Sequence, residues 1–273
     1  MNASTVSIVI PTFNRAHLVR RAIESALLQT HACEVLLVDH GSTDATREVA
    51  ATYGNRIRYI RREEDKGPAA CWLDGARQAT GEYLHFTYDD DWIQPDFIER
   101  SIANFDSDVG LVYSRASLRD ARGEKISEII QHPPGRHPSK RLIKFLLYTP
   151  LTISPGCAVF RRSDVLKNLL DGVPGAQGKY GAKSGVGEDL LLFLLTCRDY
   201  KKYVHIAEPL ADFLAHPGSI TVHAHSSGQK AELAQAYSVA KDFYTSLTNQ
   251  SVPRNFISKS IFKINWGLNS ILS

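Results

Sequence analysis

The sequence predicts an α/β protein with a doubly wound, mostly parallel sheet and helices on both of its faces. Two observations predict this fold. Short β-branched runs alternate with amphipathic stretches four times before residue 106, a pattern typical of parallel strands joined by right-handed crossover helices. The chain has 273 residues, of which 43% are hydrophobic and 22% charged, so it is long enough to bury one large core.

The first half supplies its strands and helices in strict alternation. The strands are rich in Val, Ile and Leu, which suits burial on both faces. Each helix carries an apolar face. Gly54 and Gly81 suit the ends of two helices, and Pro95 suits the first turn of another. We expect strands at 6–11, 33–40, 56–61 and 82–88, and helices at 12–29, 41–54, 67–81 and 94–105.

The second half is less regular, and we expect it to cover the ligand crevice of the sheet. No Pro/Ser-rich linker and no repeat divides the chain. The expected elements are a strand over 109–120 with a turn at 121–125, a helix over 138–148, a strand feeding a helix over 156–166, a Gly-rich stretch and helix over 180–200, and one or two strands over 201–216.

Polar residues follow three of the first-half strands. Ligands of doubly wound sheets bind beyond the carboxyl ends of the strands, where Thr12, Asp39 and the triplet Asp89, Asp90 and Asp91 lie. Adjacent carboxylates repel one another, and Mg²⁺ or Mn²⁺ would relieve that repulsion while sharing a substrate diphosphate. The alternative is a surface turn before a helix N-terminus, which also favours acids.

Charge and cysteine content narrow the class of protein. The net charge of +3 argues neither for nor against a nucleic-acid partner, but no long basic stripe occurs and no such partner is expected. Four widely spaced cysteines without a Cys-x-x-Cys pair predict buried thiols in a reducing, cytoplasmic location. The N-terminus has no signal-peptide pattern, and no apolar run approaches about 18 residues, the length of a membrane-spanning helix.

Four stretches in this order resemble the family 2 glycosyltransferases, which have the GT-A fold. They are SIVIPTFNRAHLVRRAIESALLQT, EVLLVDHGSTDAT, DKGPAACWLDGARQATGEYLHFTYDDDWIQPDFI and GEDLLLFLL. The resemblance is dense over 5–105 and returns in patches beyond it. We therefore expect one GT-A domain over 1–253, with a Rossmann-like nucleotide-binding half at about 1–114, an irregular acceptor half at about 115–225 and a helical stretch at 226–253.

The resemblance implies a donor site at the strand ends. Asp39 is expected to accept a hydrogen bond from a uracil-type base, while His40 replaces the second acid of the family's DDGS stretch. Trp72 stands where an arginine usually meets the diphosphate, which leaves that charge to a metal, Arg15, Arg77 or a later basic residue. The donor-binding residues implied are Pro11, Thr12, Asn14, Arg15, Asp39, Gly67 and Asp89.

The resemblance also implies a metal site for Mn²⁺ or Mg²⁺. Counting back from Pro95 makes Asp90 the expected ligand, with Asp89 near the ribose and Asp91 bound directly or through water. Tyr88 stands where the first acid of the family motif is often found. His216 is implied as a further ligand, and its alternative is an ordinary surface or core histidine.

The Glu-Asp pair of GEDLLLFLL supplies the implied catalytic residues. Transfer with inversion needs a base to take the proton of the acceptor hydroxyl, a role that falls to Asp189 with support from Glu188. An acidic first helical turn is the alternative explanation. Gly156 and Trp92 are tentative acceptor-site residues, and the alternative for Gly156 is close packing.

The expected function is metal-dependent, inverting transfer of a sugar from a nucleotide sugar, UDP-linked by expectation. The expected acceptor is a hydroxyl of a glycan, a lipid-linked or a small molecule, in bacterial polysaccharide or glycoconjugate assembly. A nucleotidyltransferase and a degenerate nucleotide-sugar-binding subunit are the alternatives. A C-terminal amphipathic helix at 254–273 is expected to pack on its own domain, on a second copy in a homodimer, or on the inner face of a membrane.

Overall fold

The computed structural model describes residues 5–129, 133–178, 184–219, 222–223 and 227–248. Its elements are β1 (Val6–Thr12), α1 (Val19–Leu27), β2 (Cys33–His40), α2 (Thr46–Ala51), η1 (Gly54–Arg56), β3 (Arg58–Arg62), α3 (Pro68–Gln78), β4 (Tyr83–Phe86), β5 (Trp92–Ile93), α4 (Phe97–Ile102), β6 (Val109–Arg119), β7 (Lys125–Ile129), β8 (Gly135–Pro138), α5 (Ser139–Tyr148), η2 (Pro155–Cys157), β9 (Ala158–Arg161), α6 (Arg162–Asn168), α7 (Glu188–Asp199), β10 (Lys202–Leu214) and α9 (Lys230–Thr248).

The predicted alternation of strands and helices is present through β4 and α4. The first two helices begin later than predicted, at Val19 and Thr46, because the residues before them form loops at the strand ends. The segment over 202–214, predicted as one or two strands, is the single strand β10. The helix α9 lies inside the helical stretch expected at 226–253, whereas the helix expected at 254–273 lies outside the described residues.

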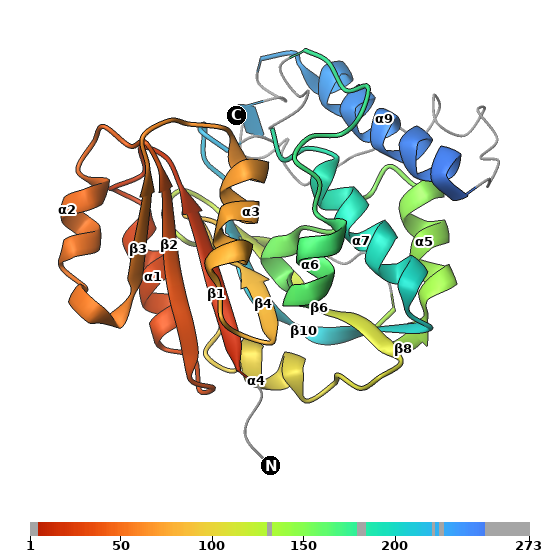
Figure 1. The fold of residues 1–273 in the computed structure, drawn as a ribbon, viewed down its shortest axis with the longest axis horizontal. Helices are drawn as coiled ribbons and strands as arrows, with labels where there is room; N and C mark the ends of the chain where they lie inside the picture. The colour runs from red at the N-terminus through yellow and green to blue at the C-terminus, as the bar shows by residue number, and fades with distance from the viewer. Residues whose placement is uncertain (1–4, 130–132, 179–183, 220–221, 224–226, 249–273) are drawn as a thin grey trace.

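One sheet runs through the molecule in the order β3-β2-β1-β4-β9-β6-β10-β5, with β7 on β6 and β8 on β10. Its first four strands are parallel, as predicted. Beyond them the sheet is mixed, since β9 runs antiparallel to both β4 and β6 while β6 and β10 are parallel. The α/β class with helices on both faces is confirmed (Figure 1).

The handedness of the crossovers decides which helix covers which face. The chain moves from β1 outward to β3 and then crosses back to β4. Right-handed connections in opposite directions place their helices on opposite faces, and α1 lies behind the sheet while α3 lies in front of it (Figure 1). The strand order therefore reverses between β1 and β4, where a ligand crevice is expected.

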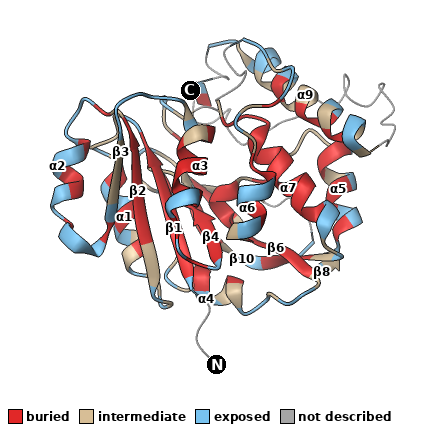
Figure 2. Ribbon diagram, viewed as in Figure 1, coloured by how far each residue is buried: buried red, intermediate tan, exposed pale blue. Residues whose placement is uncertain are grey.

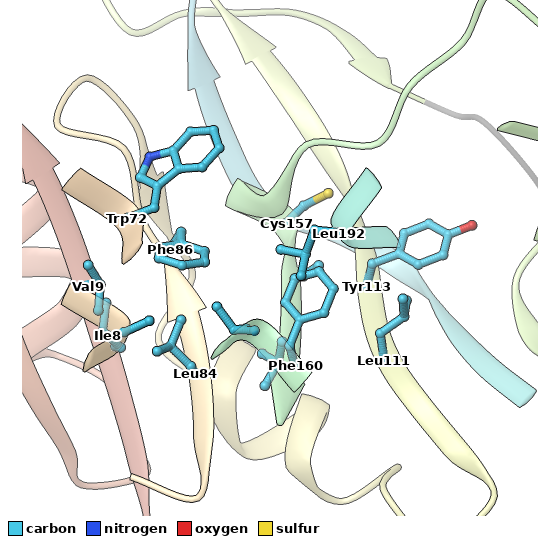
Figure 3. Packing of buried hydrophobic residues seen from close by; sticks show 14 of the residues in the cluster. Ile8, Val9, Trp72, Leu84, Phe86, Leu111, Tyr113, Cys157, Phe160 and Leu192 are labelled. Carbon is cyan, nitrogen blue, oxygen red and sulfur yellow. The ribbon is translucent and has the colours of Figure 1, made fainter. Parts of the chain in front are cut away.

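The core lies on both faces of the sheet and continues around α7 (Figure 2). Every residue of α7 from Glu188 to Cys197 is buried, because the helix is enclosed by β6, α5, α6 and α9. Phe160 of β9 meets Phe193 of α7 edge-on at 5.2 Å between ring centroids, and Leu192 lies beside Phe160 in the same layer (Figure 3). Burying one such side chain contributes about 1.5–3 kcal/mol.

The four cysteines agree with the expectation of reduced, buried thiols. Cys71, Cys157 and Cys197 are buried thiols, Cys33 is partly buried, and all four are free of disulfides. Within the described part of the chain, no helix is both long and apolar enough to cross a bilayer.

Candidate active site

A cavity of about 460 Å³ opens beyond the carboxyl ends of β1, β2 and β4. One wall comes from the loops after these strands and includes Thr12 and Asp90. The second half of the chain contributes Asp189 and, from α9, Tyr237, while His40 lines the cavity from the end of β2. Residues more than 200 positions apart thus face one space, which is the arrangement that a two-substrate site requires.

Five of the seven predicted donor residues line the cavity, namely Pro11, Thr12, Arg15, Gly67 and Asp89. Gly67 adopts a φ of 84° at the start of α3, which a residue with a side chain rarely adopts. Arg15 donates from its guanidinium to the Gly218 carbonyl at 2.9 Å. This bond joins the loop after β1 to the turn that follows β10.

Asn14 has a structural position beside the cavity, outside its lining. Its backbone has a φ of 53°, and its side-chain oxygen accepts a hydrogen bond from the Thr43 amide at 2.8 Å. Asn is among the few residues that adopt this left-handed conformation readily. Asn14 therefore holds the loop after β1 against the loop after β2.

Asp39 is placed differently from the expectation of a base contact. Its side chain is fully buried and is not part of the cavity lining. One carboxylate oxygen accepts from the Ser42 amide at 2.9 Å, and the other accepts from the Tyr59 hydroxyl at 2.5 Å and from Arg61 at 3.2 Å. The carboxylate thus ties β2 to β3, and this geometry does not support direct contact with a nucleotide base.

His40 occupies the cavity wall instead of Asp39. Successive side chains of a strand point to opposite faces, so Asp39 faces Tyr59 and Arg61 while His40 faces α3. Its Nε2 lies 3.4 Å from an Asp74 carboxylate oxygen, and both ring nitrogens are buried without a well-aligned hydrogen bond. Burial lowers the pKa of His40 below its ordinary 6.5, which favours a neutral ring.

The three adjacent aspartates have separate environments. The pKa of Asp89 is raised to about 7, chiefly by burial and then by the negative charge of Asp90, while Arg15 opposes the shift. Asp91 accepts a hydrogen bond from the Leu214 amide at 2.9 Å and so fixes the end of β10. Burial also raises the pKa of Asp91 well above its usual range.

Asp90 lines the cavity, and its carboxylate oxygen lies 2.9 Å from Nε2 of His216, which is outside the lining. The other ring nitrogen of His216 accepts from the Gly218 amide at 3.2 Å. Among the described residues no group of three or more metal-ligating side chains is present. Two protein donors nevertheless fit an Mg²⁺ or Mn²⁺ ion that takes its other ligands from water and a substrate diphosphate.

Cations that could meet a diphosphate are few among the described lining residues. Arg15 supplies their only guanidinium, and no lysine is among them. Arg77, the other arginine considered from the sequence, is mostly exposed, lies 3.9 Å from Asp74 and is outside the lining.

The Glu-Asp pair begins α7, and its two members face different surroundings. Asp189 lines the cavity, whereas Glu188 is fully buried and does not. Burial raises the pKa of Asp189 from its ordinary 3.8 to about 6, although hydrogen bonds to its carboxylate oppose the rise. A carboxylate with a pKa close to neutrality suits general-base chemistry, so the geometry favours Asp189 over Glu188 for proton transfer.

Aromatic side chains form the floor of the cavity near Asp189. Trp72 stacks on Tyr88 with 5.7 Å between ring centroids and also packs on Phe86 at 5.9 Å. Its indole is almost fully buried, which agrees with a core aromatic that also borders the cavity. Tyr88 therefore presents a phenol to the site where the family motif has an acid.

The two tentative acceptor residues lie outside the lining. Gly156 sits beneath Tyr88, and a Cβ there would lie 3.1 Å from Phe213 and 3.4 Å from Tyr88, so its close-packing alternative is favoured. Trp92 pairs with Asp212 between β5 and β10, and the Arg21 guanidinium lies 4.4 Å from its ring centroid. This geometry assigns Trp92 to packing against α1 and away from the cavity.

His40 and Tyr237 are site residues that the sequence did not single out. His40 was noted only as a departure from the family pattern, and alternation along the strand was the one available signal. No sequence signal marked Tyr237, because it comes from α9, 48 positions after Asp189.

Several curated proteins are similar to part of this chain. An uncharacterized glycosyltransferase of Rickettsia typhi is 31% identical over 169 residues, covering 60% of this chain and 52% of that protein. The chondroitin synthase of Escherichia coli is 36% identical over 128 residues, covering 45% of this chain and 18% of that protein. The chain thus spans about half or less of the length of these relatives.

Solved structures share the fold at low sequence identity. Staphylococcus aureus TarS 1-349 in complex with UDP-GlcNAc has a TM-score of 0.62 and 16% identity, covering 89% of this chain and 73% of that one. The mannosyltransferase PcManGT of Pyrobaculum calidifontis, in complex with GDP-Man and Mn²⁺, has a TM-score of 0.58 and 18% identity, covering 94% and 68%. The model of the family described as Glycosyl transferase family 2 matches residues 7–169, and the chain belongs to that family.

Proposed function

We propose that the protein transfers a sugar from a nucleoside diphosphate sugar to an acceptor hydroxyl, with inversion at the anomeric carbon. One observation carries the proposal. Asp189, with a pKa raised to about 6, shares a single cavity with Asp90, whose carboxylate is hydrogen-bonded to His216 just outside the lining. Such a transfer needs two parts. One is a base for the acceptor hydroxyl, and the other is a set of oxygen and nitrogen ligands for the cation that binds the diphosphate.

The donor is proposed to bind at the reversal point between β1 and β4. Arg15 and Asp90 line the cavity there, and Asp90 is hydrogen-bonded to His216. The ligands bound in the two solved structures, UDP-GlcNAc and GDP-Man, support a nucleoside diphosphate sugar as donor. We keep a UDP-sugar as the expected donor, and the buried Asp39 makes His40 the better candidate for a contact with its base.

A divalent ion would be held by Asp90 and His216. When bound, Mn²⁺ or Mg²⁺ supplies Lewis-acid neutralisation of the diphosphate charge. Arg15 adds a fixed positive charge on the same side of the cavity. Asp91 holds the end of β10, which leads into the turn that carries His216.

Asp189 is proposed to take the proton of the acceptor hydroxyl. The acceptor oxygen then bonds to the anomeric carbon while the bond from that carbon to the diphosphate oxygen breaks, and the nucleoside diphosphate leaves with the electron pair. A single displacement of this kind inverts the anomeric centre. Glu188 is proposed only to support the start of α7, because it is buried outside the lining.

The acceptor is proposed to be a glycan, a lipid-linked or a small molecule in bacterial polysaccharide or glycoconjugate assembly. The name of one relative supports this class, since the chondroitin synthase of E. coli matches part of the chain. Membrane contact through 254–273 and a homodimer stay predictions.

Two variants test the proposal with a panel of UDP- and GDP-sugars, each with and without Mn²⁺. Asp90→Asn is expected to lose Mn²⁺-dependent donor binding, measured by calorimetry. Asp189→Asn is expected to bind donor normally and to lose turnover by about 10²- to 10⁴-fold. Asp96→Asn is the matched control, because Asp96 is a partly exposed acid in the same stretch of chain as Asp90.

Other outcomes would separate the alternative functions. Donor binding without turnover in the wild-type protein would favour the degenerate binding subunit. Release of pyrophosphate from a nucleoside triphosphate and a sugar phosphate would indicate a nucleotidyltransferase. Full turnover by Asp189→Asn would remove the base assignment.

A further inference from the structure

The hydrogen bonds around Asp189 distinguish its two carboxylate oxygens. Oδ1 accepts from the Gly187 amide at 2.8 Å and from the Leu190 amide at 2.7 Å. Oδ2 accepts from the Tyr237 hydroxyl at 3.0 Å. Each carboxylate oxygen offers about two lone-pair sites, so these bonds fill Oδ1 and leave one acceptor site on Oδ2.

The helix that supplies Tyr237 is packed closely against the start of α7. Gly187, at a φ of 96°, is the residue before α7, and a Cβ on it would lie 3.2 Å from the Ala240 Cβ and 3.4 Å from the Ala236 carbonyl. The absence of a side chain on Gly187 therefore lets α9 approach Asp189. Tyr237, one turn from Ala240, lines the same cavity.

We propose that Tyr237 is a positioning residue for the base: its hydroxyl holds Oδ2 of Asp189 so that the remaining lone pair of this oxygen faces the acceptor. This inference rests on the proposed function and adds to it the oxygen that takes the proton. It also gives α9 a role in the reaction, although this helix lies outside the matched residues 7–169.

Few titratable groups face Asp189 from the elements packed around it. Tyr237 comes from α9 and Tyr88 from the loop after β4, and burial raises the pKa of both phenols well above 10. Both are therefore neutral donors at pH 7. Glu188 adjoins Asp189 on α7 but is buried away from the lining. Removing the Tyr237 hydroxyl thus withdraws a donor from the charged carboxylate without adding a charge.

The test compares Tyr237→Phe with Tyr244→Phe. Tyr244 lies two turns further along α9 and is buried in the core. Its substitution by Phe also removes one hydroxyl, but at a position away from Asp189. The first readout needs no substrate: carboxyl ¹³C NMR of Asp-labelled protein follows the titration of Asp189, assigned by the loss of its resonance in Asp189→Asn. A hydrogen bond to a charged group is worth about 1.5–3 kcal/mol, or one to two pKa units.

We expect the titration midpoint of Asp189 to rise by at least about one pH unit in Tyr237→Phe and to stay unchanged in Tyr244→Phe. The kcat/KM of the variant is then measured against pH with the donor identified in the panel. The apparent pKa of the acid limb should rise by the same amount, while the donor KM stays constant. An unshifted midpoint in a folded Tyr237→Phe protein, or an equal shift in Tyr244→Phe, would overturn the positioning role.

The proposed function can fail separately from this inference. If Asp189→Asn keeps its turnover, the base assignment fails whatever the NMR titration shows. If Asp189→Asn is inactive but Tyr237→Phe matches the wild type in both midpoint and pH profile, only the positioning role fails.

Discussion

The substitution Asp189→Asn should make the protein more stable at neutral pH while removing its activity. Asparagine keeps the size of aspartate, and its amide oxygen can accept from the Gly187 and Leu190 amides as Oδ1 does now. Its NH₂ group can then donate to the Tyr237 hydroxyl oxygen. The substitution therefore removes a buried charge and keeps both amide donors paired, while the Tyr237 hydroxyl changes from donor to acceptor at this contact.

The size and pH dependence of this gain follow from the pKa of Asp189. Burial raises it from 3.8 to about 6 in the folded protein. At about 1.4 kcal/mol per pKa unit, the ionised carboxylate lowers the free energy of unfolding by up to about 3 kcal/mol above pH 6. Because the folded state binds more protons than the unfolded state between these two pKa values, the penalty fades as the pH falls from 6 toward 4.

The assay is urea unfolding of the wild type and Asp189→Asn at pH 7.5 and pH 4.5. We expect the variant to be more stable by about 2–3 kcal/mol at the higher pH and by less than about 1 kcal/mol at the lower one. Asp96→Asn, which alters a partly exposed acid, should show neither effect. A variant that is less stable at pH 7.5, or whose advantage is the same at both values, would refute the assignment of a buried, charged Asp189.

Three further predictions follow from the site. In the wild type, kcat/KM should fall about tenfold per pH unit below about pH 6, as Asp189 takes up its proton; a flat profile down to pH 5 in steady-state assays would contradict this. His40→Ala should raise the donor KM by about 2- to 10-fold with kcat retained, the loss expected for one hydrogen bond to the imidazole ring, and an unchanged KM would exclude His40 from donor binding. Gly185→Ala should lower the free energy of unfolding in urea by about 1–3 kcal/mol, because φ is +80° and a Cβ would lie 2.9 Å from the Trp72 ring; wild-type stability would show that this loop is free to move.

The nucleotide-binding half is the part that its local sequence determines most fully. Its strands are continuous apolar runs and its helices carry one apolar face, so periodicity alone places β1 to β4 and the crevice beyond them. The acidic loop followed from that placement, because the strand before it ends at Phe86 and leaves Asp89 to Asp91 at the carboxyl end of the sheet.

The assignment of the base contact to Asp39 depended on a choice that the local sequence leaves open. Alternation along β2 requires Asp39 and His40 to face opposite sides of the sheet. Only the pairing of β2 with β3 and the packing of α3 decide which side is which. Tyr59 and Arg61 take Asp39 on one side, and the cavity receives His40 on the other.

Hydrophobic periodicity is enough to locate the strands and helices and to leave the aspartates at the strand ends. The contacts among the polar and aromatic side chains arise only when the chain packs: Asp90 meets His216, Asp189 meets Tyr237, and Trp92 meets Arg21 away from both. The physical reason is that periodicity reports a residue's own burial, whereas these contacts join segments up to 126 positions apart. Their distance along the chain leaves no local pattern, so they follow from how the packed elements close around the cavity.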